Sequence, residues 1–600
     1  MPRAPLAVLL LTACGSATPA RSGAGADLAI RDVRVFDGVV VLEHRTVLVA
    51  RGRIVALDAA DRLARSPATH EIDGRGATLL PGLIDAHAHV NQDADPRDAL
   101  DVGVTTEIDM MSSPEVSVRL ARDAAATDRA RVVPAGYAAT APGGHGTEYG
   151  MEVPTLTTPA EAEAFVAARV KDGSHHLKII IEGGLAFGHP LPTLDAATVG
   201  ALVVAAHAHH LLAVAHVGGP ADVAVALAGG VDGLVHVPLG ALDEATIATI
   251  ASRGMFVAPT LSVLASVCGQ RPGRALLADA RLAPLIGPDA RATLGAPFGF
   301  TVEDASACGT PAATVAALRA HRVPLLAGTD APNAGTAHGA TVHGELERLV
   351  AAGLTPVEAL TAATSAAARA FALADLGAIR VGAIADLLLV TGDPTRDITA
   401  TRAIAHVWRG GRELDLNARR VAVGAEIERE REKARQLLGV VADFDRDAAQ
   451  PTARYGRFGP GSDQLMGGTS SSHIALVDGG AHGSARALEV TGVAVAPGPA
   501  IGGVWAGLSF VPAATGFDPV DYTIARRLTF SVRGDDKTYA LIVWSDMAHP
   551  PSTTFVAPRA WTDVSIDLPA LGALDAIRVI SWAATQPGAF AFQLDHIAFE

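Results

Sequence analysis

The chain has 600 residues, of which 49% are hydrophobic and only 18% are charged, a balance that excludes an intrinsically disordered protein and suits large buried cores. Its formal net charge of −15 at pH 7 comes without any run of lysine or arginine, which excludes an electrostatic footprint for nucleic acid or an anionic membrane surface. Domains typically span about 100–200 residues, with barrels larger, so the length predicts two or three folded units.

A signal peptide and a tether are predicted over residues 1–27. The apolar run from Ala4 to Ala13 is about ten residues long, too short for the roughly 30 Å hydrocarbon core of a bilayer, and is typical of a secretory signal. It ends in Leu11-Thr12-Ala13-Cys14-Gly15, which resembles the bacterial lipobox. That resemblance implies a lipoprotein that is lipidated at Cys14 and anchored outside the cytoplasm, on the periplasmic side or the surface of a bacterial membrane. A plain signal peptide with an incidental cysteine is the alternative. In an oxidising compartment Cys268 and Cys308 would pair, or remain two free buried thiols.

Two β-rich pieces flank a longer α/β region. Short strands are predicted near residues 28–35, 47–50 and 54–57, within a first piece that spans 28–80. Similar strands are predicted over 384–414, within a second piece that spans 381–420. We expect the two pieces to meet in one small β-sandwich.

The region 81–380 alternates apolar strand candidates with helical segments. Thr158-Pro159-Ala160-Glu161 and Thr355-Pro356-Val357-Glu358 each supply an N-cap, a proline at the first helical position and a glutamate at the third. Eight strands with helices between them predict a TIM-like (β/α)8 barrel, whose active site lies at the carboxyl ends of the strands. The strand candidates are residues 79–90, 103–110, 131–140, 176–184, 211–219, 233–238, 254–261 and 323–333.

Candidate metal ligands lie at the ends of these strands. His87 and His89 end the first strand one residue apart, and strand side chains repeat every two residues, so both leave the same face and can reach one ion. Further candidates each end a later apolar run: Lys178, His216, His236 and Asp330. Because the carboxyl ends of barrel strands meet at one rim, these side chains are expected to gather in one metal site.

A charged helix from about Glu426 to Leu438 is predicted to act as a spacer within residues 421–440. Glycine, serine, threonine and β-branched residues dominate from 441 to 600, and no long helical period continues there. This composition predicts a separate all-β domain, a jelly roll or an antiparallel sandwich.

Residues from about 28 to 420 resemble the amidohydrolase superfamily of metal-dependent hydrolases. The matching motifs are Pro81 to His89, Leu177-Lys178-Ile179, Ala215-His216, Val235-His236 and Gly328 to Asn333. Two other segments, Ala141 to Gly146 and His338 to Leu346, resemble the branch that includes imidazolonepropionase-like proteins and certain metal-dependent dipeptidases.

This resemblance implies two divalent ions, and zinc suits their imidazole ligands, although manganese, iron or cobalt would also be accepted. His87 and His89 would hold the more buried ion, and His216 and His236 the second. A protonated Lys178 would repel two dications, and the family implies instead a carbamate, formed with carbon dioxide, that bridges both ions. A lysine paired to Glu182 or exposed at the barrel mouth is the alternative.

Asp330 would complete the first metal site and act as the catalytic residue that transfers protons. A water that bridges two dications has its pKa lowered toward about 7, so hydroxide is available at neutral pH. Asp330 would orient that hydroxide, take its proton and deliver it to the leaving nitrogen or oxygen. An ordinary turn or N-cap aspartate is the alternative, since Pro332 and Asn333 follow, and the two roles are compatible.

Two more histidines are candidate substrate-binding residues. His145 lies in the glycine-rich loop after the third strand, where it would bind substrate or remain a solvent-exposed loop residue. His343 lies on the helix after the eighth strand, and His338 is the alternative to it.

Residues from about 440 onward resemble the complex I intermediate-associated protein family, a galactose-binding-like jelly roll also related to some carbohydrate-binding modules. The matching pieces are Gly467 to Ser470, Leu508 to Phe510, Leu528 to Asp535 and Leu594 to Ile597. The resemblance leaves open a glycan ligand or simple packing against the barrel, and the 4% content of aromatic residues disfavours an extended sugar-stacking surface.

These observations predict a lipid-anchored hydrolase that cleaves an amide, cyclic amide or dipeptide-like bond in a small molecule or peptide. Three rivals fit the same sequence. One is an esterase, lactonase or phosphotriesterase with the same site, and another is a mononuclear deaminase-like enzyme that does not need Lys178. The third is an extracytoplasmic glycan-binding protein with an inert barrel.

Overall fold

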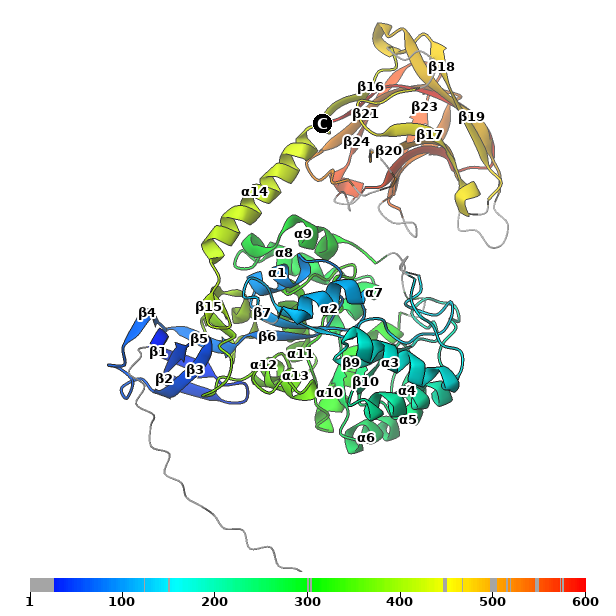
Figure 1. Cartoon of the computed structure of the whole chain (residues 1–600). Coiled ribbons are helices and arrows are strands. Elements are labelled where there is room, and N and C mark those ends of the chain that lie inside the picture. The colour runs from blue at the N-terminus through cyan, green and yellow to red at the C-terminus, as the bar shows by residue number, and fades with distance from the viewer. Residues whose placement is uncertain are drawn as a thin grey trace, which may run out of the picture.

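The computed structural model describes residues 26–600 except 124, 149–151, 299–301, 303–304, 446–450, 467, 497–503, 514–515, 518–519, 545–549, 572–573 and 575–576. The predicted signal peptide and Cys14 lie outside the described residues. A small β-sheet, an α/β body, a long helix and an all-β region follow one another along the chain (Figure 1).

The two flanks of the α/β body share one eight-stranded sheet with the order β15-β14-β13-β5-β1-β2-β3, and β4 pairs with β1. Strands β5 and β13 join the flanks through antiparallel pairing, with Leu79 opposite Leu389. Ile30, Val47 and Trp408 are buried in the core of this sheet. Its strands are β1 (Ala26–Phe36), β2 (Val41–Ala50), β3 (Arg53–Ala59), β4 (Ala68–Asp73), β5 (Ala77–Pro81), β13 (Leu387–Thr391), β14 (Ile404–Arg409) and β15 (Arg412–Glu413).

The α/β body contains two parallel sheets, β6-β7-β8 and β9-β10-β11-β12. A parallel bridge between Ala139 and Ile179 links the end of β8 to β9. All these strands are short and almost wholly buried, as expected of parallel strands covered on both faces. They are β6 (Leu83–Ala88), β7 (Val104–Asp109), β8 (Arg131–Pro134), β9 (His176–Ile181), β10 (Leu212–Val217), β11 (Gly233–Val235) and β12 (Phe256–Ala258).

The eighth predicted strand, residues 323–333, does not form a regular strand. It makes single parallel bridges, from Leu325 to Val257 of β12 and from Ala331 to Ala88 of β6. Pro324 has no N–H to donate, and Asp330 has a left-handed φ of 61°, so the ladder is interrupted at both ends. The segment nevertheless contacts both sheets, which brings Asp330 next to the end of β6.

Helices follow most of these strands, and the two predicted capping boxes are present at Thr158 and Thr355. The helices of the body are α1 (Asp95–Asp101), α2 (Pro114–Arg122), α3 (Ala162–Asp172), α4 (Ala196–Ala208), α5 (Pro220–Gly229), α6 (Glu244–Ser252), α7 (Leu261–Val267), α8 (Pro272–Ala278), α9 (Pro288–Gly295), α10 (Thr310–Ala320), α11 (Ala340–Ala351), α12 (Pro356–Ala362) and α13 (Ser365–Ala370). Helices α7 to α9 belong to a long excursion after β12. A disulfide between Cys268 and Cys308, whose Cα atoms lie 5.8 Å apart, closes this excursion, so the paired alternative holds.

The spacer helix α14 (Leu416–Arg435) begins about ten residues before the predicted start at Glu426. Its N-cap is Asp415, whose side chain accepts from the Ala418 N–H. Arg419 in the first turn pairs with Asp98 at 3.1 Å and with Asp101, both on α1, which fixes this end of the helix to the body. Among the described residues, no helix combines the length and the apolar character needed to cross a membrane.

The C-terminal region is all-β, as predicted. A six-stranded antiparallel sheet has the order β18-β19-β26-β21-β24, with β16 paired to β26, and a five-stranded sheet has the order β17-β20-β25-β22-β23. Phe510, Phe530, Trp582 and Phe592 are buried in a common core. The strands are β16 (Gly439–Ala442), β17 (Arg457–Ser462), β18 (Ser471–Asp478), β19 (Arg486–Ala494), β20 (Ala506–Val511), β21 (Arg527–Gly534), β22 (Lys537–Trp544), β23 (Ser552–Ala557), β24 (Thr562–Asp567), β25 (Val579–Ala584) and β26 (Gly588–Phe599).

Candidate metal and active site

The six candidate ligands converge at the carboxyl ends of the parallel strands. Two come from β6 and the residue after it, one each from β9 and β10, one from the residue after β11, and one from the 323–333 segment. Together with Met111, His145, Ile180 and Asn333, they line one narrow cavity of about 30 Å³. The six are His87, His89, Lys178, His216, His236 and Asp330.

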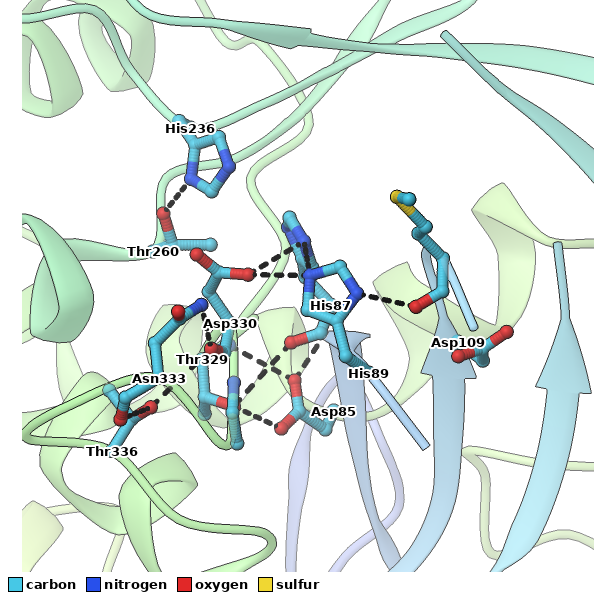
Figure 2. Close-up of polar contacts among 12 residues, drawn as sticks. Asp85, His87, His89, Asp109, His236, Thr260, Thr329, Asp330, Asn333 and Thr336 are labelled. Carbon is cyan, nitrogen blue, oxygen red and sulfur yellow. Dashed lines mark hydrogen bonds and ion pairs between the residues drawn. The ribbon is translucent and has the colours of Figure 1, made fainter. Parts of the chain in front are cut away.

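His87, His89 and Asp330 form the tightest part of this cluster (Figure 2). The Nε2 atoms of the two histidines are 3.3 Å apart, and they lie 3.1 Å (His87) and 2.8 Å (His89) from Oδ1 of Asp330. Their ligand atoms all lie within 4.8 Å of one another. Two imidazole nitrogens and a carboxylate oxygen that point at a common centre are donors that suit a divalent cation.

Hydrogen bonds fix the tautomers of two of these histidines. Nδ1 of His89 lies 2.8 Å from the Met111 carbonyl, which only accepts, so Nδ1 carries the proton and the Nε2 lone pair faces Asp330. The Thr260 hydroxyl donates to the Pro259 carbonyl, so it accepts from Nδ1 of His236 at 2.6 Å and leaves the Nε2 lone pair of His236 free.

Burial keeps three histidines of the cluster neutral. Desolvation holds the pKa of His87, His216 and His236 well below the usual value, so these imidazoles are in the form that binds metals. The His216 and His236 rings are 4.5 Å apart, and Nε2 of His216 lies 3.2 Å from the Glu182 carboxylate. The donor set therefore fits metal ions.

Lys178 is almost completely buried among these histidines. Its Nζ makes no hydrogen bond within the described part of the chain, and burial lowers the pKa of Lys178 to about 7. Lys178 is neither exposed at the barrel mouth nor paired to Glu182, the two alternatives considered from the sequence. Glu182 contacts His216 and the Gly184 N–H instead. An amine in this environment is uncharged for much of the time at neutral pH.

Three residues of the site have left-handed backbone conformations, with φ of 67° at His236, 53° at Thr260 and 61° at Asp330. Such positions cost energy for residues other than glycine and cluster at functional sites. At Asp330 the conformation is held from both sides, because its N–H donates to the His87 carbonyl at 2.8 Å and Thr329 is bound to Asp85.

Asp85 is a buried residue of the site that our sequence reasoning did not single out. Its carboxyl group accepts from the His87 N–H and from the N–H and hydroxyl of Thr329, at 3.1, 3.1 and 2.5 Å. It therefore ties β6 to the segment that carries Asp330 (Figure 2). The sequence feature that could have identified it is an aspartate between apolar residues in the Pro81 to His89 motif.

His338, the alternative substrate-binding residue, lies behind the site. Its Nδ1 lies 2.7 Å from Glu107 and its Nε2 lies 3.4 Å from Asp95, and all three side chains are buried. Asp95 also accepts hydrogen bonds from the N–H groups of Asn91 and Gln92. These bonds hold the backbone segment that follows His89. Burial alone would lower the pKa of His338, but the carboxylates of Glu107, Asp95 and Asp85 raise it to about 9.

The raised pKa of His338 predicts that its contribution to the stability of the fold is lost at alkaline pH. A histidine whose folded pKa exceeds its unfolded value of about 6.5 stabilises the fold fully below that value, and the stabilisation is lost as the pH rises through about 9. We expect the melting temperature of the wild type to exceed that of His338→Gln at pH 7, in chelator, and the gap to shrink by pH 10. A gap that is the same at both pH values would contradict this assignment.

His343 does not reach the site, and the prediction that it binds substrate is not supported. It lies on the buried face of α11, where Nε2 is 2.9 Å from the Val102 carbonyl and Nδ1 is 3.0 Å from the Thr401 hydroxyl. Both ring nitrogens are used inside the protein, and the residue lines neither cavity at the site.

A second cavity, of about 250 Å³, adjoins the ligand cluster and is a little smaller than typical ligand pockets of about 300–1,000 Å³. His145 lines both cavities, with its ring 4.9 Å from that of His216 and its Nδ1 2.6 Å from Glu148. The rest of the wall is largely apolar, with contributions from α7 and the loops after β9 and β11: Ala186, Phe187, Val217, Leu239, Val263, Leu264, Val267 and Phe298. His145 is thus placed where the sequence predicted a substrate-binding residue.

Imidazoles and a carboxylate gathered near the carboxyl ends of parallel strands, beside an open pocket, are typical of metal-dependent hydrolases built on an α/β barrel. The chain belongs to the amidohydrolase family, whose model matches residues 78–414. The matched region begins in β5 and ends after β15, so it contains every candidate ligand.

Solved structures with a similar fold span the same region. A proposed prolidase from Bifidobacterium longum is 26% identical, with a TM-score of 0.53, over 66% of this chain and 98% of its own. A Xaa-Pro dipeptidase is 23% identical, with a TM-score of 0.52, over 64% of this chain and 99% of its own. The A. niger ochratoxinase is 19% identical, with a TM-score of 0.52, over 65% and 96%. The last two likenesses show a shared fold, a TIM-like barrel.

Curated relatives match over short stretches only. The adenine deaminase of Shigella flexneri is 41% identical over 70 residues, which are 12% of this chain and 12% of the relative. The imidazolonepropionase of Ectopseudomonas mendocina is 48% identical over 62 residues, 10% of this chain and 15% of the relative. These matches span far less than two thirds of the relatives, so they add support to the family and do not define an activity.

Proposed function

We propose that the protein is a binuclear metal-dependent hydrolase of carbon–nitrogen bonds in amides, cyclic amides or dipeptide-like compounds. The observation that carries the proposal is the convergence of six ligand-type side chains from five elements in one buried cavity beside a larger pocket. We also propose that the 323–333 segment closes the two parallel sheets into an eight-membered barrel, since it bridges β12 and β6.

In this proposal His87, His89 and Asp330 hold one ion, His216 and His236 hold the other, and Lys178 lies between the two groups. When bound, divalent ions would polarise the scissile carbonyl and lower the pKa of a bridging water to near 7. The burial of Lys178 without a hydrogen-bond partner supports a carbamate there. The uncharged amine would attack carbon dioxide, a nitrogen–carbon bond would form and one proton would leave, giving an anion that offers two ligand oxygens.

The protein's own groups would handle the proton and the substrate. In this proposal Asp330 is ionised, because its carboxylate oxygen lies 3.1 and 2.8 Å from the Nε2 atoms of His87 and His89, an arrangement that a bound cation stabilises. Its carboxylate would take the proton of the attacking water and deliver it to the leaving nitrogen. His145, held by Glu148 between the two cavities, would contact the substrate.

The bond that fixes the tautomer of His236 offers a specific test. Thr260→Val keeps the shape of the side chain but removes the hydroxyl that accepts from Nδ1 of His236, and we expect zinc affinity to fall by about 10–100-fold. Thr260→Ser keeps the hydroxyl and is the matched control. Competition with a chelating dye measures both affinities, and an unchanged affinity in Thr260→Val would show that this bond does not orient a ligand.

A panel assay tests the proposed activity. Protein that starts after Cys14, supplied with zinc and bicarbonate, would be assayed on amides, cyclic amides and dipeptides beside esters, lactones, phosphotriesters and aminated nucleobases. We expect the first three classes to be hydrolysed. Turnover confined to esters, lactones or phosphotriesters would favour the first rival, and deamination would favour the mononuclear one. No turnover at all would favour the binding protein with an inert barrel.

We also propose an extracytoplasmic location with a lipid anchor at Cys14. The disulfide between Cys268 and Cys308 supports an oxidising compartment. The two-sheet C-terminal region supports the proposal of a galactose-binding-like jelly roll, for which a glycan remains our candidate ligand. A Cys14→Ser variant that leaves the membrane fraction, while the wild type stays in it, would support the anchor.

A further inference from the structure

The lining of the larger cavity has a polar part and an apolar part. It shares His145, His216, His236, Asp330 and Asn333 with the ligand cluster, so a scissile carbonyl belongs beside these residues. The apolar part includes Phe187, Leu264 and Phe298, whose side chains are each partly exposed, and the Phe187 ring lies 5.4 Å from that of His145. A substrate whose carbonyl is at the ligand cluster would therefore extend one of its substituents along an apolar wall.

The charged groups of this cavity are acidic. Besides Asp330, the lining includes Glu182, which is buried, and Glu148, whose side chain is 45% exposed. Asp222 is also buried nearby, beside Gly183, and its carboxylate accepts from the N–H groups of Gly218 and Gly219. An anionic substituent placed here would meet like charges in a partly desolvated space, which is unfavourable.

No lysine or arginine side chain of the described lining offsets these carboxylates. The chain contains no lysine or arginine over residues 132–168, 179–252, 254–270, 292–318 and 323–347, which include the loops after β8 to β11 and after residue 331. The first cation after α7 is Arg271, which donates to the Gly295 carbonyl and lines a different cavity. A substrate carboxylate would thus find no guanidinium or ammonium partner, which is how proteins usually bind that group.

We propose that the site selects amides whose substituent in the larger cavity is apolar and neutral or cationic, and that it discriminates against substrates with a free carboxylate at that position. This inference rests on the proposed function and narrows its substrate class. Dipeptides, whose free carboxylate lies next to the scissile bond, are the slower substrates of the proposed class, and the corresponding amides, anilides and amine conjugates are the faster ones.

A matched substrate pair tests the inference. An Xaa-Pro dipeptide and the same compound with a C-terminal carboxamide differ only in the negative charge. With the wild-type protein, zinc and bicarbonate, we expect kcat/KM to be at least tenfold higher for the carboxamide. Equal values, or a preference for the free acid, would overturn the inference while leaving the hydrolase proposal intact.

If neither compound is hydrolysed, the pair lies outside the substrates of the site, the panel assay decides the proposed function, and the selectivity is decided by binding. Calorimetry on the same pair would support the inference if the carboxamide binds at least tenfold tighter, and would overturn it if the free acid binds as tightly. Leu264→Arg adds a cation at the cavity wall and should reduce the tenfold preference to near one by improving kcat/KM for the free acid. Leu264→Gln, similar in polarity but uncharged, should keep the preference.

Discussion

Asp330→Asn is expected to lower amide turnover at least about a thousandfold, because an amide cannot take up the proton of the attacking water, and positioned acid–base groups contribute about 10²–10⁴-fold. The fold should survive. Asparagine matches aspartate in size and tolerates the left-handed φ of 61° at this position better than most residues. Steady-state kinetics gives the first quantity, and the melting temperature, within a few degrees of the wild type, gives the second.

Asp243→Asn is the matched control for this variant. Asp243 is the exposed N-cap of α6 and accepts from the Thr246 N–H, and asparagine caps helices about as well as aspartate. We expect full activity from the control. If folded Asp330→Asn kept turnover within tenfold of the wild type, Asp330 would have no part in the proton transfers.

Lys178→Ala is expected to reduce bound zinc from two ions per chain to one or fewer and to lower turnover at least a hundredfold. The reason is that the variant removes the one lysine in the described lining of the narrow cavity, the side chain that we propose bridges the two ions. Addition of a small carboxylate such as acetate or propionate, which can occupy the vacated space, should restore part of the metal content and turnover. Metal analysis and kinetics on the same samples measure both effects.

Lys171→Ala, an exposed lysine at the end of α3, is the matched control and should behave as the wild type. A Lys178→Ala protein that keeps two ions and full turnover would show that the carbamate is not needed. One ion in both proteins, with turnover that does not depend on Lys178, would point to the mononuclear rival.

The convergence of the candidate ligands could be predicted because it depends on simple periodicity. His87 and His89 share a face of β6 since strand side chains alternate. Lys178, His216 and His236 meet them because parallel strands place their carboxyl ends at one edge. The amphipathic pattern and the strand ends are local properties of the sequence, so a single chain was enough to read them.

The parts that could not be predicted depend on tertiary contacts. The helix that carries His343 was expected, but the face that it turns toward the site depends on how α11 packs against Val102 and Thr401. The cluster of His338 with Glu107 pairs residues 231 positions apart, and no local pattern marks such a pair. The pairing of Cys268 with Cys308 likewise depended on a Cα separation that only the fold defines.

Two predictions about secondary structure, the 323–333 strand and the start of helix α14, were wrong for reasons that the local sequence contains. The 323–333 segment was expected to be a strand from its apolar residues, but Pro324 and the left-handed Asp330 prevent a continuous ladder. Helix α14 was expected to begin at Glu426 because the charged residues start there. Asp415, however, already supplies an N-cap before a helical stretch.

A metal titration shows directly whether the protein is a two-metal hydrolase. Metal-free protein that starts after Cys14 would be titrated with zinc in bicarbonate buffer, and bound metal and hydrolysis of a neutral amide would be followed together. We expect turnover to be absent without metal and to reach its plateau at two ions per chain. Turnover without metal, a plateau at one ion, or no retained metal would contradict this expectation.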